Sequence, residues 1–558
     1  AEVEAVVRHV AHGKPVPGDV IREIIQRCDG VPLFIEEVAR AVIEAGVLQE
    51  NEYSWTLTGA LPLDLIPASA DASLMARIDR LGEARGTAQL AATIGREFTY
   101  AQLHAVSERT ETEINDDLEH ILAAGLAWQV AETSPTTFVF KHALVQMAAY
   151  ESLLRSTRQR FHERIARVLL SDFGGEVALR PEIVARHLSG AGHHAEASDH
   201  WFAAGQSALA RMAVPEAHGH FSRALDGLAK LPTSDEVLTK EMELQIAIAP
   251  TLMTLYAWES PTVAEPCERA RSLSHRLERP DRLYEPIWGL WTNLFVGGQL
   301  DRALETANEA LSMALASGVP MLEVTGRHAV SYTRYYRAEW AECIEHAHAG
   351  IALYALDQER ALTNTFQISS TVNLVAGLAS SLWMTGHQDQ GLAELDRMIA
   401  MARDLDHPSA LSNALGVACY MLTFHHDPPR MLAHAAELKS FARADGWELW
   451  YAVGVMSRGW ARLRLGDRVD GLRELFEGVA LFRATRSDLM GPTVAVIHAE
   501  GLRAAGRDDE ALEMLAATAE TARRGHVGVL LPDVYRLMGE IHLQAGALAQ
   551  AEAAFDLA

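Results

Sequence analysis

A glycine recurs at a fixed spacing through the second half of the chain. It is followed five residues later by Ala or Gly, and usually by Leu after that. The copies of this pattern begin at Gly298 with Ala303, Gly386 with Gly391, Gly466 with Gly471, Gly506 with Ala511 and Gly546 with Ala551. Self-similarity at a fixed period predicts a stack of repeated units, each of which buries its apolar face against its neighbours. Such stacks present extended binding surfaces.

Each copy is expected to form two antiparallel helices, which gives about eight or nine pairs over residues 193–558. The glycine that opens the pattern falls in the turn between the helices, where a left-handed backbone favours glycine. The small residue five positions later is expected to let the second helix approach the first closely. The same sequence ladder includes Gly459 and Gly539 on the first helix and Phe555 one turn after Ala551.

A small residue, a turn glycine, a second small residue and a bulky residue in this order resemble the tetratricopeptide (TPR) repeat. That repeat usually has about 34 residues, and the present copies are longer, which longer helices or turns would absorb. The resemblance implies a superhelix of α-α pairs whose concave face binds a peptide or another protein. Self-association is a further option.

Composition excludes several function classes. The chain has 558 residues, too many for one core, and 74 acidic residues outnumber 49 basic ones, for a net charge of -25. Nucleic acid and anionic membranes bind through Lys and Arg, so neither is an expected partner. The four cysteines (Cys28, Cys267, Cys343, Cys419) form no CxxC pair, and no apolar run is long enough to span a membrane. We therefore expect a cytoplasmic protein.

Residues 19–46 contain two amphipathic segments separated by Gly30-Val-Pro32. Pro32 is expected to start the second helix, because proline suits the first helical turn. Residues 1–48 are therefore interpreted as a helical module, and 49–71 as an extended linker.

Residues 72–155 follow the order of a winged-helix domain. A short helix is expected over 100–106, a capped helix over 110–124 and two strands over 126–130 and 137–140, with connecting helices over 156–192. The helix in the recognition position carries five carboxylates that would repel phosphates: Glu111, Glu113, Asp116, Asp117 and Glu119. We therefore expect this domain to pack and switch rather than to bind DNA.

Three segments in this order, 30–37 (GVPLFIEE), 94–98 (IGREF) and 138–154 (FVFKHALVQMAAYESLL), resemble a bacterial family. Its members join a class III adenylate/guanylate cyclase, an AAA/STAND-type ATPase and a TPR tail. The resemblance implies that 1–48 is the lid of that ATPase, with Gly30 and Pro32 beside the adenine. It further implies that Lys141 and His142 lie near the nucleotide β-phosphate. From the residues alone, His142 could equally cap the helix after the wing.

A phosphate-binding loop is absent, because Gly13-Lys14 is followed by Pro15 and Arg8 stands where the first glycine is needed. No catalytic residue, metal site or cofactor is therefore expected in this chain, and ATP or ADP with Mg²⁺ would belong to a longer parent. The histidines at 193–194, 346, 348 and 425–426 lack neighbouring ligands at metal-site spacing.

The sequence thus predicts a mainly all-α chain: lid helices, a winged-helix domain with a small β-wing and a TPR-like superhelix. Its expected function is that of the regulatory, protein-binding half of a bacterial signal-transduction ATPase, cut from a longer protein. Two alternatives remain. One is part of a large ATP-binding transcription regulator with a helix-turn-helix beyond the C-terminus, and the other is a TPR scaffold with no nucleotide role.

Overall fold

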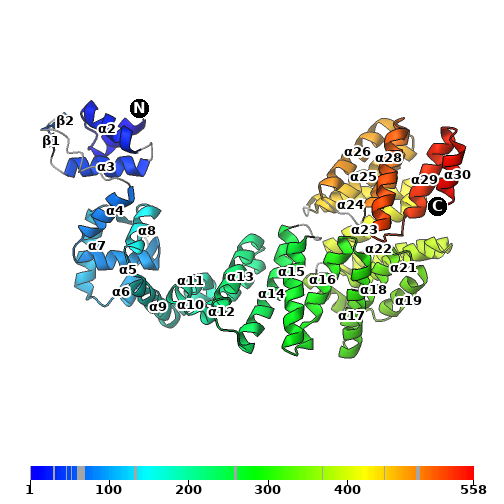
Figure 1. The fold of residues 1–558 in the computed structure, drawn as a ribbon, viewed down its shortest axis with the longest axis horizontal. Helices are drawn as coiled ribbons and strands as arrows, with labels where there is room; N and C mark the ends of the chain where they lie inside the picture. The colour runs from blue at the N-terminus through cyan, green and yellow to red at the C-terminus, as the bar shows by residue number, and fades with distance from the viewer. Residues whose placement is uncertain are drawn as a thin grey trace. The chain divides into compact units, whose positions relative to one another are not determined.

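The chain forms two compact units of packed helices (Figure 1). Unit 1 comprises Ala1–Arg211 with Ser222–Pro232, and unit 2 comprises Met212–Phe221 with Thr233–Ala558. The computed structural model describes residues 2–28, 32–44, 47–51, 53–58, 70–130, 135–256, 260–366, 368–425, 427–444, 447–485 and 490–558.

Unit 1 begins with a helical module closed by a β-hairpin and continues into a small mixed domain and further helices. Its elements are α1 (Glu2–Val10), α2 (Gly18–Cys28), α3 (Pro32–Glu44), β1 (Leu48–Glu50), β2 (Trp55–Leu57), α4 (Ala70–Asp79), α5 (Ala84–Ile94), β3 (Glu97–Thr99), α6 (Tyr100–Val106), α7 (Glu111–Ala123), β4 (Ala127–Gln129), β5 (Thr137–Phe140), α8 (Ala143–Glu151), α9 (Arg155–Asp172), α10 (Gly174–Leu179), α11 (Pro181–Ala191) and α12 (His194–Ala210). Helix α13 (Val214–Leu228) contributes residues to both units.

The hairpin β1–β2 corrects the expected linker over 49–71. The two strands pair antiparallel, with Leu48 opposite Leu57. Trp55 is buried in the core formed by α1, α2 and α3, and its Nε1–H donates to the carbonyl of Ala11 at 3.1 Å. Residues 48–57 therefore belong to the first module, because the indole ring fills its apolar core.

Helices α5, α6 and α7 and three short strands make the small mixed domain. The strand order is β3-β5-β4, all antiparallel, and the stacked rings of Phe98 and Phe138 form part of its core. Capping boxes at Thr99 and Thr110 fix the starts of α6 and α7. The expected helices over 100–106 and 110–124 and the two expected strands are present, and β3 is a strand that sequence analysis missed.

The α7 carboxylates differ from the expectation at one position. Asp117 is buried rather than exposed, where it accepts a hydrogen bond from Thr87 Oγ1 and pairs with Arg109 Nε at 2.9 Å. It therefore stabilises the domain core and cannot face an external phosphate.

A buried chain of hydrogen bonds joins α8 to α9 and α11. Tyr150 Oη lies 2.9 Å from His162 Nε2, and His162 Nδ1 lies 2.9 Å from His187 Nδ1. Burial, with a contribution from the Arg186 charge, lowers the pKa of His162 to about 4. This imidazole is therefore neutral near pH 7 and ties α8 to the helices that follow it.

Unit 2 is helical over its described residues. Its elements are α14 (Asp235–Leu255), α15 (Pro261–Arg276), the short 3-10 helix η2 (Pro280–Arg282), α16 (Tyr284–Val296), α17 (Leu300–Ser317), α18 (Pro320–Tyr336), α19 (Trp340–Ile351), α20 (Leu356–Phe366), α21 (Ser370–Met384), α22 (Gln388–Leu405), α23 (Pro408–His425), α24 (Pro428–Ala444), α25 (Glu448–Arg464), α26 (Arg468–Ala484), α27 (Gly491–Ala504), α28 (Asp508–Arg524), α29 (Leu531–Gln544) and α30 (Leu548–Phe555). Among the described helices of the chain, none combines the length and the apolar run that crossing a bilayer requires.

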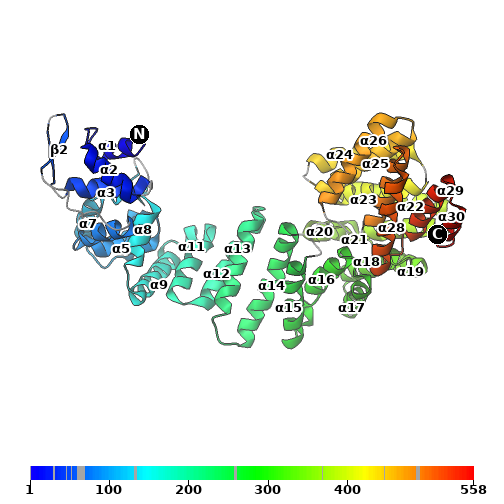
Figure 2. The ribbon, with the colours of Figure 1, turned by 45° about the horizontal axis from the view of Figure 1, so that its top comes forward.

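These helices pack as consecutive pairs, for example α17 against α16 and α26 against α25 (Figures 1 and 2). The first helices of neighbouring pairs also touch, as in the series α18, α21, α23, α25 and α27. This double stacking gives a TPR-like α-α superhelix in which the first helices form one continuous layer.

The repeated glycines occupy the turns between paired helices. Gly298, Gly386, Gly466, Gly506 and Gly546 have φ between +68° and +98° and open space where a Cβ would lie. In the pair α18–α19 the equivalent turn residue is Ala338, with φ of +63°. A left-handed backbone at alanine costs about 1–2 kcal/mol, so this repeat keeps the turn without the glycine that favours it.

The second small residue of each copy lies where two helices approach closely. A Cβ on Gly391 would lie 2.8 Å from the Ala379 carbonyl oxygen, and one on Gly471 would lie 2.6 Å from Leu463 N. In the other three copies the residue is alanine and is buried: Ala303, Ala511 and Ala551.

Candidate functional site

The start of α8 in unit 1 meets the side of helix α3. Lys141 Nζ donates to Glu36 Oε1, and His142 Nε2 lies 4.0 Å from Glu36 Oε2. Arg40 Nη2, one turn further along α3, donates to Glu36 Oε1 at 3.1 Å. The fold thus joins two predicted site segments that are 105 positions apart in sequence. We call Glu36, Arg40, Lys141 and His142 the junction cluster.

The backbone of the wing positions these side chains. Lys141 N donates to the Leu126 carbonyl at 2.9 Å, which anchors the end of β5. His142 is the N-cap residue of α8 in an extended conformation, but its side chain makes no capping hydrogen bond. Its Nε2 is buried and has no hydrogen-bond partner. Capping therefore does not explain the position of this imidazole, which lies against Glu36.

Charge in the junction cluster is arranged around Glu36. Burial raises the pKa of this carboxyl, but the hydrogen bonds and charges of Lys141 and Arg40 outweigh burial and hold the pKa below its ordinary value. A Cβ placed on Gly125 would lie 3.6 Å from Arg77 Nη2 and 3.8 Å from Arg40 Nη1, so two guanidinium groups meet beside the cluster. This arrangement can hold a carboxylate, and it places several donors where an external anion could compete for them.

The structure says less about the other two residues that were predicted to contact a nucleotide, Gly30 and Pro32. Pro32 is the first residue of α3, as expected, but its side chain lies outside the described part of the chain. Gly30 also lies outside the described residues. The structure therefore brings Lys141 and His142 to the predicted lid helix without showing where an adenine would contact it.

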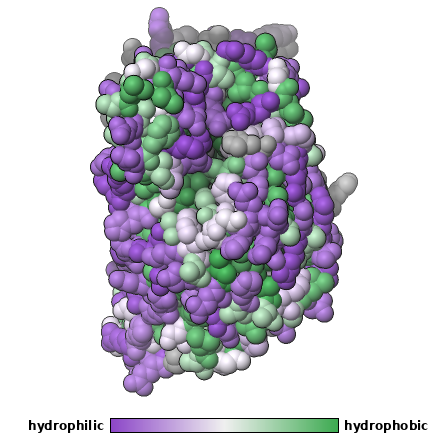
Figure 3. All heavy atoms as spheres, turned by 90° about the vertical axis from the view of Figure 1, so that its right-hand side faces the viewer, coloured by the Kyte–Doolittle hydropathy of each residue, from purple (hydrophilic) through white to green (hydrophobic). Residues whose placement is uncertain are grey.

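Unit 2 contains a second candidate site on its inner face. A cavity of about 50 Å³ is lined by α18, α21, α23, α25, α27 and the residues just before α29. Aromatic rings dominate the wall: Tyr332, Tyr335, Tyr336, Trp383, Tyr420, Phe424 and Trp450. We call this cavity the aromatic pocket. Figure 3 shows unit 2 from one end, where hydrophobic residues lie in patches among hydrophilic ones and around a hollow in that face.

Among the described residues that line the aromatic pocket, none is Asp, Glu, Lys, Arg or His. Burial raises the pKa of Tyr335 to about 12 and that of Tyr332, Tyr336 and Tyr420 further, so the phenols stay protonated. Trp383 Nε1 is buried and has no hydrogen-bond partner. The described wall of the pocket is therefore apolar and aromatic, with protonated phenol groups.

A short segment between α28 and α29 closes one side of the aromatic pocket. Backbone N–H groups of Gly528 and Val529 donate to the Tyr336 carbonyl at 2.8 and 3.2 Å. His526 Nδ1 lies 2.7 Å from Asp301 Oδ2 in helix α17. We call residues 525–530 the crossing segment. A regular solenoid has contacts only between adjacent repeats, and here a late repeat returns to two early ones.

Sequence analysis missed the aromatic pocket, although one signal was present. Tyr332, Tyr335 and Tyr336 are spaced to share one face of a helix. Their partners on α21, α23 and α25 come from other repeats, and no local pattern indicates that these helices converge.

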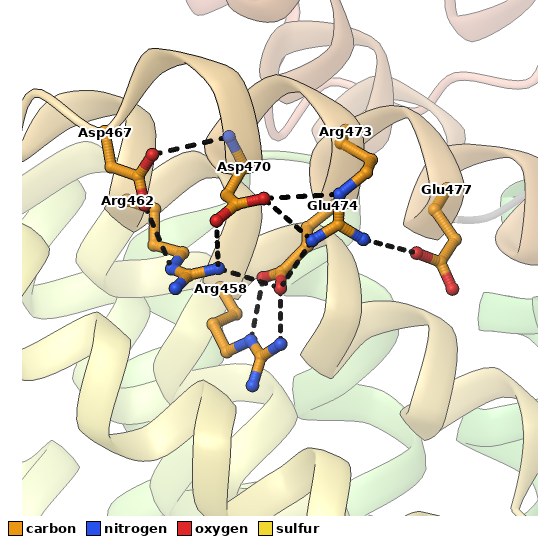
Figure 4. Close-up of polar contacts among 7 residues, drawn as sticks. All are labelled: Arg458, Arg462, Asp467, Asp470, Arg473, Glu474 and Glu477. Carbon is orange, nitrogen blue, oxygen red and sulfur yellow. Dashed lines mark hydrogen bonds and ion pairs between the residues drawn. The ribbon is translucent and has the colours of Figure 1, made fainter.

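A charged cluster of unit 2, between α25 and α26, contrasts with the junction cluster (Figure 4). Glu474 has a side chain only 4% exposed and accepts two hydrogen bonds from Arg458 and one from Arg462 at 3.0 Å. Asp467, Asp470 and Glu477 pair in turn with Arg462 and Arg473. We call these seven residues the Glu474 network. It joins α25 to α26, where Gly459 allows backbone contact with Leu475, and we assign it a structural role.

Metal ligation is not supported in the part of the chain that the structure describes. No group of three His, Cys, Asp or Glu side chains converges there. Cys267, Cys343 and Cys419 are free and buried, and burial raises the pKa of Cys267 and of Cys419 to about 12, which keeps both thiols inert.

Comparison with known proteins gives one distant relative and several weak structural neighbours. No protein-family model matches the chain. A Rhizobium meliloti (strain 1021) protein described as uncharacterized protein R02095 is 25% identical over 536 residues, which cover 94% of this chain and 51% of that protein. The chain therefore spans about half the length of the curated relative that it matches.

Among solved structures, the similar chains are helical proteins at low identity. They include the apo form of RapI (TM-score 0.36, 11% identity, 59% of this chain and 98% of that chain). A STAND protein with a tetratricopeptide repeat sensor from Pyrococcus horikoshii has a TM-score of 0.36 and 11% identity, over 88% of this chain and 73% of that one. The apo quorum sensor NprR from B. thuringiensis gives 0.41 and 10%, over 64% and 96%. At these scores, the description of the fold rests on the helix pairing itself.

Proposed function

We propose that unit 2 binds a protein or peptide partner on the face formed by the first helices of its repeats. The observation that carries this proposal is the aromatic pocket, a preformed cavity lined mainly by apolar and aromatic side chains. Ligand sites are typically concave and apolar, with a few polar groups that fix orientation. The crossing segment supports the proposal, because its hydrogen bonds to Tyr336 hold the wall in place before any partner arrives.

Selection of a random dodecapeptide display library on the immobilised chain tests this function. We expect enriched peptides to protect amides of α18, α21 and α23 from hydrogen exchange. Protection confined to the outer helices α19, α22 and α24, or no enrichment, would contradict the proposal. Peptides selected on a Tyr420→Ala variant serve as the matched control, since this change removes one ring of the pocket wall.

We also propose that the chain is the regulatory half of a longer bacterial signal-transduction ATPase. In that protein the junction cluster would contact the phosphates of ATP or ADP bound with Mg²⁺, through Lys141 and His142. The unpartnered Nε2 of His142 supports this role, as does the motif resemblance to cyclase-linked ATPases. A cyclase domain and a cytoplasmic location are parts of this proposal that rest on the resemblance and on composition.

The two alternatives make different demands on the parent sequence. A basic helix-turn-helix after the repeats would favour a transcription regulator. A parent without a phosphate-binding loop would favour a TPR scaffold with no nucleotide role. In that case unit 2 would still bind a partner, and the junction cluster would not respond to nucleotide.

A further inference from the structure

We propose that the crossing segment acts as a clasp, which closes over the layer of first helices (α18, α21, α23, α25 and α27) and must open before a partner binds there. This inference rests on the proposed partner-binding function of unit 2 and adds a regulatory step to it. The closed form is the one that the structure shows.

The backbone of the crossing segment attaches it to an early repeat. The N–H groups of Gly528 and Val529 both donate to the carbonyl of Tyr336, at 2.8 and 3.2 Å. Tyr336 is the last residue of α18, and the final carbonyl groups of a helix have no partner within that helix. A segment from between α28 and α29 therefore supplies hydrogen bonds at the end of α18.

Two glycines let the crossing segment lie directly on the turns of early repeats. A Cβ on Gly525 would lie 3.0 Å from the carbonyl oxygen of Gly298, in the turn between α16 and α17. A Cβ on Gly528 would lie 3.1 Å from the carbonyl oxygen of Arg337 and 3.2 Å from the Cβ of Ala338, between α18 and α19. Such close approach of two backbones favours glycine, so a larger residue would push the segment away.

Apolar side chains keep the crossing segment closed. Val527, Val529 and Leu530 are buried and belong to the same apolar core as α16, α17 and α18. His526 Nδ1 and Asp301 Oδ2 lie 2.7 Å apart on side chains that are more than half exposed, and exposed pairs contribute little to stability. Because opening would expose the three apolar side chains, the closed form dominates and the open form is a minor state.

The crossing segment can open without unfolding a helix pair. In a solenoid each repeat is held by its neighbours in the stack, and α28 packs directly against α27 and α29. The contacts of the crossing segment with α18 and with the early turns are additional to this packing. Segments held by few contacts open locally at a lower free energy than the surrounding core.

The crossing segment lies where a partner would bind. Its residues Val529 and Leu530 form part of one wall together with side chains of α18, α21, α23, α25 and α27. A peptide laid on this layer would compete with the segment for the end of α18. When only a fraction of the molecules is open, the apparent dissociation constant rises by the inverse of that fraction. Loosening the segment should therefore strengthen partner binding, which loss of a purely structural contact would not do.

Hydrogen exchange of the whole chain, read by mass spectrometry, tests whether the crossing segment opens by itself. We expect the amide of Val529 to exchange at least about tenfold faster than amides in the middle of α28 and α29. Gly528→Ala should speed this exchange by about a further tenfold, because it disturbs both hydrogen bonds to Tyr336. Gly491→Ala is the matched control, since its Cβ would have nothing within 4 Å. If Val529 exchanges only together with α28 and α29, the proposal is wrong.

A disulfide across the closed contact tests whether opening admits the partner. The Cβ atoms at 528 and 338 would lie 3.2 Å apart, close to the separation that a disulfide spans. Gly528→Cys combined with Ala338→Cys should therefore lock the closed form when oxidised. The probe is a dodecapeptide selected on the immobilised wild-type chain. We expect oxidation to weaken its binding at least about tenfold and reduction to restore it. Gly528→Cys alone, treated with the same oxidant, should bind equally in both states.

The outcomes separate this inference from the proposed function. Equal affinity of the double-cysteine chain in its oxidised and reduced forms would overturn the regulatory step and leave partner binding intact. Weaker peptide binding by Gly528→Ala than by Gly491→Ala would overturn it as well, because we expect the opposite order. Failure of the library to yield any peptide would contradict the proposed function, and with it the regulatory step.

Discussion

Two ionic clusters, each centred on one glutamate, differ in whether their polar atoms are fully used. In the Glu474 network, three arginines and four carboxylates bond one another across α25 and α26. In the junction cluster, Glu36 pairs with Lys141 and Arg40, and the neighbouring His142 keeps a buried nitrogen without a hydrogen bond. Buried polar groups are nearly always satisfied. The Glu474 network is thus internally paired, whereas the junction cluster leaves His142 Nε2 without a hydrogen bond, and under the proposed function this is the cluster that another group would meet.

Removing the charge of Glu474 should have the largest effect on stability. Glu474→Gln leaves Arg458 and Arg462 facing a neutral amide in a nearly buried site, which typically costs about 3 kcal/mol. Hydrogen exchange of the α25 and α26 amides in unit 2 would measure this loss. Glu477→Gln, an exposed partner of Arg473, is the matched control and should change stability by less than about 0.5 kcal/mol. Equal effects from both variants would refute the structural role.

Replacing Glu36 by Gln should reduce stability less than the Glu474 substitution does, because the Glu36 side chain is 18% exposed. We expect Glu36→Gln to lower the stability of α3 and α8 by about 1–2 kcal/mol, measured by hydrogen exchange in unit 1. Glu4→Gln, which removes an exposed pair with Arg8 on α1, is the control. A loss as large as that of Glu474→Gln would mean that the junction cluster is built for stability rather than for binding.

A substitution at His142 tests whether the junction cluster contacts a nucleotide. In a longer protein that contains a phosphate-binding loop, His142→Ala should change nucleotide retention about tenfold, since one charge-assisted hydrogen bond contributes about 1.5 kcal/mol. Retention of radiolabelled ADP after gel filtration would show this. Arg473→Ala alters the Glu474 network and should leave retention unchanged. Identical retention in the wild type and in His142→Ala would remove the phosphate role.

Lowering the pH should weaken the ion pairs of Glu36 in the junction cluster. Because the pKa of Glu36 is lower in the folded chain than its ordinary value of 4.5, its pairing contributes fully above pH 4.5. This contribution is lost as the pH falls through the lower folded value. The difference in α3 exchange between wild type and Glu36→Gln should therefore shrink below pH 4.5, and a difference that grew there would contradict the assignment.

Much of the architecture could be predicted because it is encoded locally. Turn glycines such as Gly466 need a left-handed backbone, and their recurrence predicts helix pairs directly. Capping at Thr110 predicts the start of α7 in the same way. The hairpin that contains Trp55 was missed, because its strands have three residues each and depend on burial of one ring.

The sequence by itself determined the repeat, its helical pairs and the two residues, Lys141 and His142, that a motif singles out. These features depend on contacts within one repeat or on one short segment, so periodicity and spacing reveal them. Only the tertiary structure decided that Glu36 meets Lys141 and that the crossing segment returns to Tyr336. Both contacts join residues more than 100 positions apart, so no local spacing in the sequence can indicate them. The aromatic pocket likewise forms from helices of several repeats, which only their packing brings together.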